Sequence, residues 1–448
     1  MREVTVMDML NARDERAQMQ RDMLEKHRLP VISFSMNIAG PVKDGPLIRR
    51  AFEEGMRLLE ESGLSFVDRA EKRAFTGCEA ILAVDGDARG IKEICMQIED
   101  LPGLGRLFDM DVIGADGEKL DRGGMNRAER GCLVCGRPGR GCASRRLHPA
   151  EEIRAITRAR MEEYFRVRDR ERVGALACES LLNEVMATPK PGLVDQRNSG
   201  SHRDMNLSTF KDSIDALRPY WPRCVQIGQE TARLAPEETF LRLRGAGMTA
   251  EAVMLMATEG VNTHKGAIFT LGVICGAIGR LWRAENPCRD PQEILSECAR
   301  MTAAVLTEEL DRLRADKSRA TAGQRLLQDH GIAGVRGEMI AGLPGVRNAA
   351  LPALRRALSE GKSLNDAAVT ALMYLIAEVE DTNMIARGGL TAAREAQAQA
   401  RALTGKRAFS MDEIRALDDE YIEKNLSPGG CADMLAAALM LYRWEKDR

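Results

Sequence analysis

The amino-acid sequence predicts a multidomain protein in which an α+β domain precedes an all-α domain. The chain has 448 residues, which is more than one typical hydrophobic core and favours two domains. Residues 4–114 alternate helix-like and strand-like stretches, whereas beyond residue 165 the apolar residues recur with a helical period. Hydrophobic residues make up 44% of the chain and aromatic residues only 4%, which favours packing of helix on helix.

The N-terminal domain is expected to alternate helices and strands in chain order. Residues 4–27 predict an amphipathic helix, and the β-branched run VISFSMNIAG at 31–40 predicts a strand that ends in a loop. The later elements are expected as a helix at 46–62, a strand at 80–86, a helix at 88–100 and a strand at 106–114. This alternation is typical of an α/β or α+β domain.

A charged helix is expected over 151–172, either as the connection between the domains or as the opening helix of the second. We place the boundary near residue 165, which gives domains 1–165 and 166–448. Further helices are expected at 174–186, 250–260, 266–283, 296–314, 364–379 and 431–444. The stretch at 391–403 is a good helix former, and no convincing strand follows the boundary. The second domain should therefore be all-α.

Cysteine usage and the N-terminal composition predict a cytoplasmic protein. The chain has 11 Cys without a regular framework, which favours reduced thiols. The N-terminus carries charges throughout and lacks an apolar signal region, and no run approaches the ~18 uncharged apolar residues of a membrane span. We expect neither export nor a membrane partner.

Charge is unevenly distributed along the chain. The net charge is −2, but residues 122–172 contain 14 Arg against 7 Asp and Glu, so this segment carries +7 and the remainder −9. One interpretation is a solvated, arginine-rich helical face, and the other is a surface for polyphosphate or an acidic protein partner. Nucleic acid is disfavoured as a partner, because the segment lacks both interleaved aromatic residues and a recognisable nucleic-acid recognition module.

A pair of carboxylates predicts the chemistry of the N-terminal domain. The segment GRLFDMDV at 105–112 places Asp109 and Asp111 two residues apart on an expected strand, so both project from one face. They can share Mg²⁺ with a triphosphate, while Arg106 neutralises charge on the leaving group. The pattern predicts a nucleotidyltransferase-like domain with Lys43 as a further phosphate ligand; a surface pair without function is the alternative.

A metal-ligand spacing follows in CLVCGRPGRGCASRRLH at 132–148. Cys132, Cys135, Cys142 and His148 have the spacing C-x2-C-x6-C-x5-H. Three thiolates and one imidazole can complete the tetrahedral shell of a structural Zn²⁺. The alternative is a group of reduced thiols that belongs to the fold.

The segment SMNIAGPVK at 35–43, the GRLFDMDV segment and the Cys/His stretch together resemble the apo-citrate lyase phosphoribosyl-dephospho-CoA transferase family, also described as the holo-acyl-carrier-protein synthase of citrate lyase. The resemblance covers roughly residues 1–150. It implies transfer of a prosthetic-group precursor to a serine hydroxyl of the lyase acyl carrier protein, with release of pyrophosphate. The family's loop more usually has proline where Ala39 stands, which bears on its rigidity.

A long polar segment, TPKPGLVDQRNSGSHRDM at 188–205, interrupts the helical pattern of the second domain. Its prolines end the helix that carries Glu184, and its glycines permit a tight path. The segment gathers Lys190, Asp195, His202, Arg203 and Asp204. Lys and Arg suit phosphates, while Asp and His suit Mg²⁺ or proton abstraction from a hydroxyl, so the loop predicts a ligand site. An irregular surface loop is the alternative.

Three further polar segments lie at expected helix ends. They are GVNTHKGA at 260–267, EDTNMIARGG at 380–389 and NLSPGG at 425–430. Exposed amides at a helix N-terminus bind anions, and we expect Ser427 to cap the last helix with Pro428 in its first turn. Each segment alone is ordinary turn chemistry, but together they predict a single polyphosphate site.

These segments, with TAGQRLLQDHGIAGVRGE and the extension NLSPGGCADMLA, closely resemble the triphosphoribosyl-dephospho-CoA synthase family over roughly residues 174–445. The resemblance implies that a ribose hydroxyl of dephospho-CoA attacks the anomeric carbon of ATP, that adenine leaves and that the triphosphate is retained. The whole chain therefore resembles a fusion of two enzymes. One makes the citrate lyase prosthetic-group precursor and the other attaches it.

Roles for the residues of the second domain follow from this chemistry. A carboxylate, Asp195 or Glu184, should stabilise oxocarbenium-like charge or deprotonate the hydroxyl, with His202 and His264 as acid or ATP-positioning groups or as structural hydrogen-bonding residues. The candidate nucleotide and phosphate ligands are Lys190, Arg203, Asn262, Lys265, Asn383, Arg387, Gly388, Gly389, Ser427, Gly429 and Gly430. Asp204 and Asp381 are further Mg²⁺ candidates.

Three other functions are compatible with the sequence. The first is the equivalent pair of steps for the malonate decarboxylase carrier. The second is a zinc-containing module that binds an acyl carrier protein without catalysis, through the +7 segment. The third is a glycohydrolase, because water as acceptor would release adenine without forming the conjugate.

Overall fold

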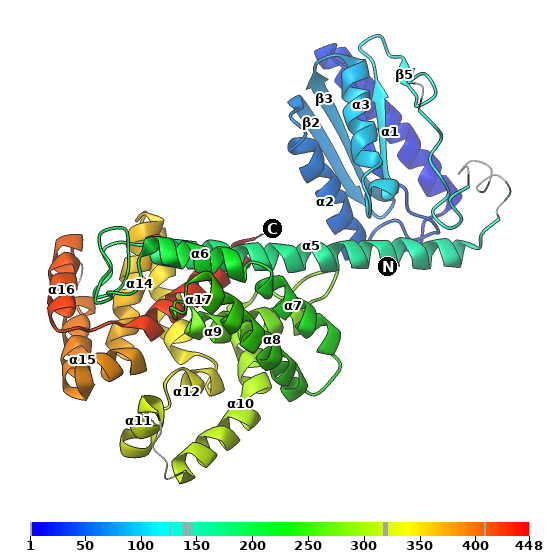
Figure 1. Cartoon of the computed structure of the whole chain (residues 1–448). Helices are drawn as coiled ribbons and strands as arrows, with labels where there is room; N and C mark the ends of the chain where they lie inside the picture. Colours follow the sequence, from blue (N-terminus) through cyan, green and yellow to red (C-terminus); the bar gives the residue numbers. More distant parts are fainter. Residues whose placement is uncertain are drawn as a thin grey trace. The chain divides into compact units, whose positions relative to one another are not determined.

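The computed structural model describes residues 2–125, 127–137, 142, 145, 147–316, 321–406 and 409–447. The chain divides into two compact units (Figure 1). The N-terminal unit comprises Met1–Arg168 and Ala284–Asn286, and the C-terminal unit comprises Asp169–Arg283 and Pro287–Arg448.

One antiparallel sheet organises the N-terminal unit. Its strands, in the order β2-β3-β1-β4-β5, are β1 (Val31–Met36), β2 (Ser65–Ala74), β3 (Gly77–Asp85), β4 (Phe108–Ile113) and β5 (Lys119–Leu120). Its helices are α1 (Val6–His27), α2 (Pro46–Glu60) and α3 (Ala88–Glu99), with a 3₁₀ turn at Gly105–Leu107. The succession β1-α2-β2-β3-α3-β4 with this strand order is the split β-α-β arrangement. The expected α+β class is confirmed.

Helices cover both faces of the sheet. Phe34 of β1 stacks on Phe52 of α2 with ring centroids 4.9 Å apart. Val31 lies on the opposite face of β1, because successive side chains of a strand alternate, and there it packs with Met23 of α1 and Ile81 of β3. Successive apolar side chains of β1 and β3 therefore point in turn to the two helical layers. This explains why the sequences of both strands are nearly continuous apolar runs.

The sequence analysis missed β2, whose residues are SFVDRAEKRA. This strand lies at the edge of the sheet, and its side chains are partly or fully exposed along its whole length. An edge strand with charges on both faces lacks the apolar run that predicts a strand. Pairing with β3 determines its structure.

The C-terminal unit is helical, and its described residues contain no strand. The helices are α5 (Ala150–Met186, which spans the division between the units), α6 (Leu207–Leu217), α7 (Tyr220–Thr231), α8 (Pro236–Ala257), α9 (Lys265–Arg280), α10 (Pro291–Ala315), α11 (Ala322–His330), α12 (Gly334–Ile340), a π-helical turn (Gly345–Ala350), α13 (Leu351–Ser359), α14 (Leu364–Glu378), α15 (Thr382–Thr404), α16 (Met411–Glu423) and α17 (Gly429–Lys446). The expected all-α character is confirmed.

Several expectations change in detail. The helices expected at 151–172 and 174–186 form one continuous helix, α5, and the helix expected at 250–260 is the second half of α8. The segment 380–389, expected as a polar stretch at a helix end, forms the first turns of α15, which kinks at Gly389 where φ is 85°. The sequence analysis also missed α6, α7, α11, α12, α13 and α16, although Ser410 and Glu413 form a capping box at the start of α16.

A single apolar core fills the C-terminal unit, with the inner helices α9, α14 and α17 at its centre. Every residue of α9 from Thr270 onward is buried, and most of α14 and α17 is also buried. The N-termini of α9 and α17 therefore begin at the edge of this core, where polar ligands can reach them. Among the helices of the described residues, none has the length and apolar character needed to cross a bilayer.

Candidate active sites

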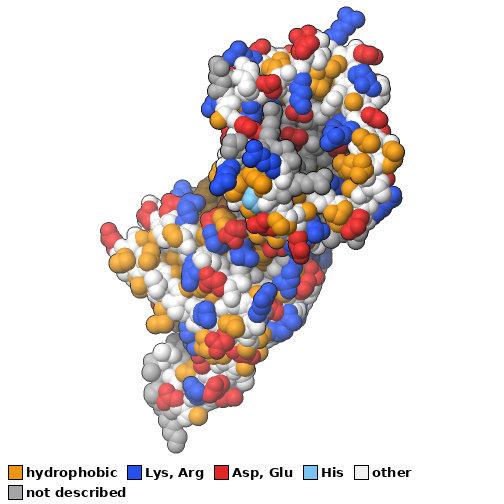
Figure 2. Space-filling view, turned by 90° about the vertical axis from the view of Figure 1, so that its right-hand side faces the viewer, with side chains coloured by type: hydrophobic (Ala, Val, Ile, Leu, Met, Phe, Trp, Pro, Cys, Tyr) orange, Lys and Arg blue, Asp and Glu red, His pale blue; other side chains and the backbone are white. Residues whose placement is uncertain are grey.

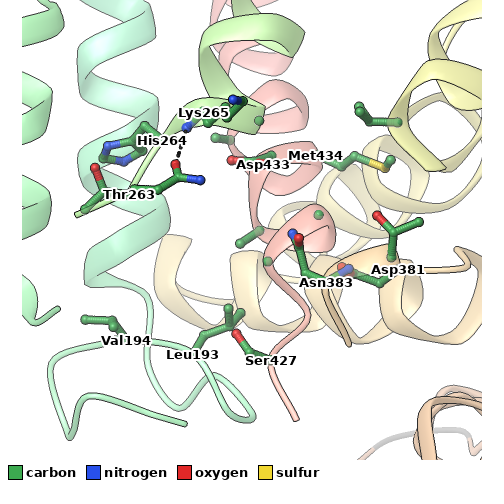
Figure 3. Close-up of a pocket in the computed structure, with 18 of the residues that line it drawn as sticks. Leu193, Val194, Thr263, His264, Lys265, Asp381, Asn383, Ser427, Asp433 and Met434 are labelled. Atoms are coloured by element: carbon green, nitrogen blue, oxygen red, sulfur yellow. Dashed lines mark hydrogen bonds between the residues drawn. The ribbon is translucent and has the colours of Figure 1, made fainter. Parts of the chain in front are cut away.

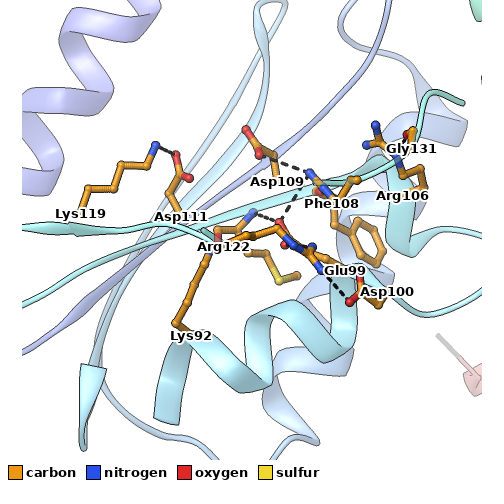
Figure 4. Close-up of polar contacts among 12 residues, drawn as sticks. Lys92, Glu99, Asp100, Arg106, Phe108, Asp109, Asp111, Lys119, Arg122 and Gly131 are labelled. Carbon is orange, nitrogen blue, oxygen red and sulfur yellow. Dashed lines mark hydrogen bonds and ion pairs between the residues drawn. The ribbon is translucent and has the colours of Figure 1, made fainter. Parts of the chain in front are cut away.

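A polar cavity of about 560 Å³ lies beside β4 in the N-terminal unit. Burial along β4 alternates, with Phe108, Met110 and Val112 inside, so Asp109 and Asp111 share the outer face as expected. The Asp111 carboxylate accepts a hydrogen bond from Lys119 Nζ at 2.6 Å. Asp109 Oδ1 lies 3.6 Å from Arg130 Nη2. Figure 4 shows Asp109 and Asp111 on β4, with Lys119 directed at Asp111. Both carboxylates line the cavity.

Side chains replace a neighbouring strand along the free edge of β4. The short β5 pairs only with Val112 and Ile113. Further along β4, the N–H of Met110 donates to Glu99 at 2.9 Å and its carbonyl accepts from Lys92 Nζ at 2.9 Å. Arg130 donates to the carbonyl of Phe108 at 2.7 Å. These contacts satisfy the edge and leave charged groups beside Asp109.

Three guanidinium groups gather around the buried Glu99. Arg122 lies 3.2 Å from Glu99 and 2.6 Å from Asp100, and Arg130 lies 3.7 Å from Glu99. Burial raises the pKa of Glu99, while Arg130 and Arg122 oppose that rise. Arg106 also lines the cavity and donates to the carbonyl of Gly131 at 2.7 Å. Burial lowers the pKa of Arg106, as does the neighbouring Arg130.

The sequence analysis did not single out Lys92, Glu99, Arg122 or Arg130 as site residues. Arg122 and Arg130 belong to the +7 segment, which was the available signal. Lys43, an expected phosphate ligand, does not line this cavity; its ammonium donates to the carbonyl of Ile38, and burial lowers its pKa.

Ion pairs account for part of the +7 segment. Arg168 lies 3.2 Å from Glu54, and Arg172 lies 2.8 Å from Asp447. Figure 2 shows basic and acidic side chains interspersed on the face that it draws. These contacts favour the interpretation of a solvated, charge-paired face for this part of the segment.

The predicted metal ligands come together after β5. The ligand atoms of Cys132, Cys135, Cys142 and His148 all lie within 4.8 Å of one another. The Sγ atoms of Cys135 and Cys142 are 3.4 Å apart. The backbone N–H of Arg137 is the main cause that lowers the pKa of Cys135 to about 6, and the neighbouring His148 and Cys142 lower it further.

A cavity of about 460 Å³ in the C-terminal unit joins segments that are far apart in sequence (Figure 3). The N-termini of α9, α15 and α17 line it. Unpaired N–H groups and aligned peptide dipoles at a helix N-terminus attract anions. Twelve predicted residues line the cavity, namely Glu184, Lys190, His202, Asn262, His264, Lys265, Asp381, Asn383, Arg387, Ser427, Gly429 and Gly430.

Lys190 and Glu184 form a buried ion pair at the cavity. Lys190 is 1% exposed and Glu184 is 4% exposed, and the ammonium donates to Glu184 Oε1. Burial raises the pKa of Glu184, while Lys190 opposes that rise. The long loop at 187–206 therefore directs a lysine inward against the end of α5.

Asp195 holds the long loop together. One of its oxygens accepts from the Thr188 hydroxyl at 2.8 Å and the Lys190 N–H at 2.9 Å. The other accepts from the backbone N–H groups of Arg197 at 2.6 Å and Asn198 at 3.1 Å. Four donors occupy this buried carboxylate, and it does not line the cavity. Four other predicted residues also lie outside the cavity lining, namely Arg203, Asp204, Gly388 and Gly389.

His264 contacts Ser213 at the cavity wall. Its Nδ1 lies 2.7 Å from the Ser213 hydroxyl, which accepts from the Thr263 hydroxyl at 2.8 Å. The buried Nε2 has no hydrogen-bond partner among the described residues. Burial and the Lys190 charge lower the pKa of His264 to about 3, so the imidazole is neutral.

His202 connects the long loop with the start of α17. Its Nε2 lies 2.9 Å from the Ser427 hydroxyl, and its Nδ1 lies 3.4 Å from Arg387. Burial and Arg387 lower the pKa of His202. The expectation that Ser427 caps α17 is wrong, because Pro428 is the N-cap residue and the Ser427 hydroxyl is directed to His202 instead.

Asp381 caps two helices at once. Its Oδ1 accepts from the N–H groups of Asn383 at 2.9 Å and Met384 at 3.1 Å in α15. Its Oδ2 accepts from the N–H of Cys431 in α17 at 2.8 Å. Burial raises the pKa of Asp381, and these three N–H donors oppose that rise. The carboxylate therefore fixes two helix N-termini beside one cavity.

Asp433 is a cavity residue that the sequence analysis missed. It lies on the first turns of α17 and faces the cavity near Lys265 (Figure 3). Burial raises its pKa well above the usual value, and the carboxylates of Glu184 and Asp381 raise it further. Its carboxylate lies against Gly266, where a Cβ atom would collide with it. The available signal was that Asp433 is the only charged residue in 429–441.

Comparisons with known proteins agree with both resemblances. Residues 4–164 match the family described as CitX, apo-citrate lyase phosphoribosyl-dephospho-CoA transferase, and residues 170–448 match the family described as CitG, ATP:dephospho-CoA triphosphoribosyl transferase. Over 451 residues the chain is 33% identical to Protein CitXG of Haemophilus influenzae, which covers 96% of this chain and 94% of that protein.

Two shorter relatives match the C-terminal part. A probable 2-(5''-triphosphoribosyl)-3'-dephosphocoenzyme-A synthase of Vibrio cholerae is 42% identical over 274 residues, with 60% of this chain and 87% of that protein covered. A protein of Salmonella typhimurium with the same description is 39% identical over 273 residues, with 60% and 89% covered.

Proposed function

We propose how two reactions are divided over this chain, which belongs to the apo-citrate lyase phosphoribosyl-dephospho-CoA transferase family over residues 4–164 and to the ATP:dephospho-CoA triphosphoribosyl transferase family over residues 170–448. The chain is a transferase of citrate lyase prosthetic-group synthesis. We assign synthesis of triphosphoribosyl-dephospho-CoA to the domain 166–448 and its attachment to the acyl carrier protein to the domain 1–165.

The observation that carries the first assignment is the convergence of three helix N-termini on one cavity that also holds Asp433. The triphosphate of ATP binds to the N-termini of α9, α15 and α17, assisted by Lys190, Lys265 and Arg387. Asn262, Asn383 and the glycines at 429 and 430 contribute amide donors along the same wall. The positive potential comes from helix N-termini rather than from a deep basic pocket, which suits a triphosphate group that must dissociate with the product.

Asp433 is the base of this reaction. A ribose hydroxyl of dephospho-CoA attacks C1′ of the ATP ribose and its proton passes to Asp433. The bond from C1′ to adenine breaks with its electrons on adenine, which takes up a proton, while the triphosphate stays on the transferred ribose. A raised pKa makes a carboxylate a stronger base. Asp195 is excluded from this role because four donors occupy its oxygens. Glu184 is the second candidate, although Lys190 engages it.

His264 stabilises the leaving adenine by hydrogen bonding. In this role the Ser213 hydroxyl donates to Nδ1 and Nε2 carries the ring proton; Nε2 has no hydrogen-bond partner among the described residues. A neutral imidazole donates one hydrogen bond from this atom to a ring nitrogen of adenine. The depressed pKa keeps the ring in this form at neutral pH.

The N-terminal cavity carries out nucleotidyltransferase chemistry on the carrier. The serine oxygen of the acyl carrier protein bonds to the phosphorus nearest the transferred ribose and gives up its proton to solvent. The bond from that phosphorus to pyrophosphate breaks with its electrons on the pyrophosphate. Arg106, Arg122 and Arg130 neutralise the departing pyrophosphate. The half-exposed Asp109 and Asp111 lie on the side of β4 that a protein substrate can reach.

We include two metal ions in the proposal. Asp109 and Asp111 fit Mg²⁺, since two carboxylates on one strand face offer the hard oxygen ligands that this ion prefers. When bound, Mg²⁺ would neutralise phosphate charge. In the C-terminal cavity the exposed Asp204 lies outside the lining, and Asp381 is engaged by three N–H donors, so neither carboxylate is assigned as a Mg²⁺ ligand in this proposal. Zn²⁺ would bind outside both cavities, at the cysteine–histidine cluster.

Mass spectrometry tests the assignment of both reactions. The full chain is incubated with ATP, Mg²⁺ and dephospho-CoA, with and without the citrate lyase acyl carrier protein. We expect free adenine and a triphosphoribosyl conjugate, followed by consumption of that conjugate and a mass increase of the carrier. The same assay with the malonate decarboxylase carrier tests the alternative partner. Adenine without conjugate would indicate a glycohydrolase, and binding of the carrier without turnover would indicate a docking module.

A further inference from the structure

The cysteine–histidine cluster has the dimensions of a tetrahedral metal site. With Zn–S bonds of about 2.3 Å and a Zn–N bond of about 2.0–2.1 Å, a tetrahedron places its ligand atoms about 3.5–3.8 Å apart. The four ligand atoms of Cys132, Cys135, Cys142 and His148 all lie within 4.8 Å of one another, and the Sγ atoms of Cys135 and Cys142 are 3.4 Å apart. Shifts of about 1 Å or less would complete the shell.

The histidine of the cluster has a free ligand atom. Nε2 of His148 is buried and has no hydrogen-bond partner among the described residues. On the other side of the ring, Nδ1 lies 3.6 Å from Glu152 Oε2 at the start of α5. Metal-ligating histidines commonly direct their second nitrogen to a carboxylate, which fixes the ring and its tautomer. A buried imidazole nitrogen that lies beside thiols and has no hydrogen-bond partner is explained by a bound metal ion.

The first two cysteines lie on a tight turn. The N–H of Cys132 donates to the carbonyl of Arg137 at 2.6 Å, and the N–H of Gly136 donates to the carbonyl of Cys132 at 3.0 Å. Gly136 has φ of 71°, a left-handed conformation that glycine adopts without strain. The turn therefore holds Cys132 and Cys135 in the C-x2-C spacing of a zinc knuckle, with both thiols close to Cys142 and His148.

The turn is continuous with the N-terminal cavity. Gly131, directly before Cys132, accepts the hydrogen bond of Arg106, and Arg130 contacts Phe108 and lies 3.6 Å from Asp109. A metal that fixes Cys132 therefore also fixes the two preceding residues, Arg130 and Gly131, and Gly131 accepts the hydrogen bond of Arg106. The described residues 127–137 lie outside the helices and strands of the unit, so the metal would supply the order that a helix or strand supplies elsewhere.

We propose that Cys132, Cys135, Cys142 and His148 bind one Zn²⁺, and that this ion positions Arg130 and the Arg106–Gly131 contact at the N-terminal cavity. The role of the ion at the cavity rests on the function proposed for that cavity, whereas the presence of the metal site does not. Zn²⁺ is the expected ion because three thiolates and one imidazole in a tetrahedral arrangement are its usual structural ligands.

Metal content of the untagged full chain tests the site. Protein purified under reducing conditions is dialysed against metal-free buffer, and zinc is measured by inductively coupled plasma mass spectrometry. We expect about one zinc per chain in the unchanged protein and in Cys288→Ser, a partly exposed cysteine outside the cluster, and almost none in the double variant Cys132→Ser/Cys135→Ser. Cobalt loading should give the visible bands of tetrahedral thiolate coordination.

Two results would overturn the metal site. One is a reduced, unchanged protein that contains no zinc and takes up neither zinc nor cobalt. The other is a metal-free protein whose mass is two hydrogens lower because Cys135 and Cys142 form a disulfide. Both measurements use the unchanged chain, so they remain decisive if a cysteine variant fails to fold.

The positioning role has a separate test. Removal of zinc should lower transfer to the carrier by about tenfold or more while adenine release stays unchanged, and added zinc should restore transfer. Equal transfer by zinc-free and zinc-loaded protein would refute the positioning role. If the zinc-loaded chain transfers nothing to any carrier, the function proposed for the cavity fails while the zinc measurement still decides the metal site.

Discussion

The two cavities hold their carboxylates in opposite ways. In the N-terminal cavity the Asp109 side chain is 52% exposed, and the charged groups pair across a sheet edge that solvent can reach. In the C-terminal cavity Glu184, Lys190 and His264 are each less than 5% exposed, and helix N-termini surround them. Under the proposed assignment the difference matches the acceptors: a serine on a protein would have to reach the first site, whereas water would have to be kept from an anomeric carbon at the second.

This difference in burial also predicts different effects of substitutions on catalysis and on folding stability in the two cavities. An exposed charge is solvated whether or not it is paired, so its removal costs little folding energy. A buried charge without its partner is expensive, so substitutions in the C-terminal cavity should affect activity and stability together. Four experiments test the contrast, and the one with the largest expected effect comes first.

Asp433→Asn should lower adenine release by about 10²–10⁴-fold, because a positioned general base contributes roughly this factor. Transfer of preformed conjugate to the carrier should be unchanged. Chromatographic measurement of adenine gives the rate. Asp419→Asn is the matched control, since that side chain is 62% exposed and pairs with Arg197 on the surface. A wild-type rate in Asp433→Asn would move the role of base to Glu184.

Lys190→Met should lower the free energy of unfolding of the C-terminal unit by about 3–5 kcal/mol, because it leaves the buried Glu184 without its partner. Lys265→Met is the control: its side chain is 59% exposed and pairs with Glu251, so it should cost less than about 1 kcal/mol. Glu184→Gln added to Lys190→Met should recover much of the loss. Equal effects of the two lysine variants would contradict the buried pair.

Urea unfolding followed by tryptophan fluorescence measures this difference. The chain has 3 Trp, and all of them lie in the C-terminal unit. They are Trp221, Trp282 and Trp444. The fluorescence signal therefore reports that unit alone.

Asp109→Asn should lower transfer to the carrier by about 10²-fold, since a carboxylate that holds a metal ion supports several kcal/mol of charge stabilisation. Its high exposure predicts unchanged stability, and adenine release should also be unchanged. Asp85→Asn, an exposed carboxylate at the end of β3, is the control. A mass shift of the carrier measures transfer; loss of adenine release in Asp109→Asn would break the assignment of separate reactions to the two cavities.

The smallest expected effect concerns pH. The pKa of His264 is about 3 in the folded chain, against an ordinary value near 6.5, so the imidazole is neutral in both states above about pH 6.5. As the pH falls below that value, only the unfolded chain binds the proton, and stability is lost progressively down to about pH 3. Relative to His264→Gln, the wild-type C-terminal unit should lose about 1.4 kcal/mol per pH unit in this range.

Unfolding experiments at about pH 7.5, 6 and 5 measure this slope, with the same tryptophan signal. The comparison with His264→Gln removes the contributions of Glu184, Asp381 and Asp433, whose raised pKa values act in the opposite direction. Parallel pH curves for the two proteins would show that His264 is not held neutral by burial.

Local patterns in the sequence were sufficient for much of the fold. Apolar patterns located α1, α3, α9, α14 and α17 within a few residues and most of α10, because the apolar side chains that a helix buries are a record in its own sequence. It did not locate β2, whose exposed edge position leaves no such record. Prolines and glycines correctly predicted the long irregular stretch before α6, because they restrict or free the backbone locally.

The sequence by itself determined which chemistry-bearing residues the chain has, the shared strand face of Asp109 and Asp111, the spacing of the cysteines and the resemblance to both families. Only the tertiary structure decided which groups surround each carboxylate. Asp195 and Asp381 accept from several backbone N–H groups, one of them donated by Cys431 from another helix, whereas Asp433 lies at the cavity wall near the carboxylates of Glu184 and Asp381. A carboxylate's role depends on donors and charges that folding brings from distant segments, and no local pattern records them.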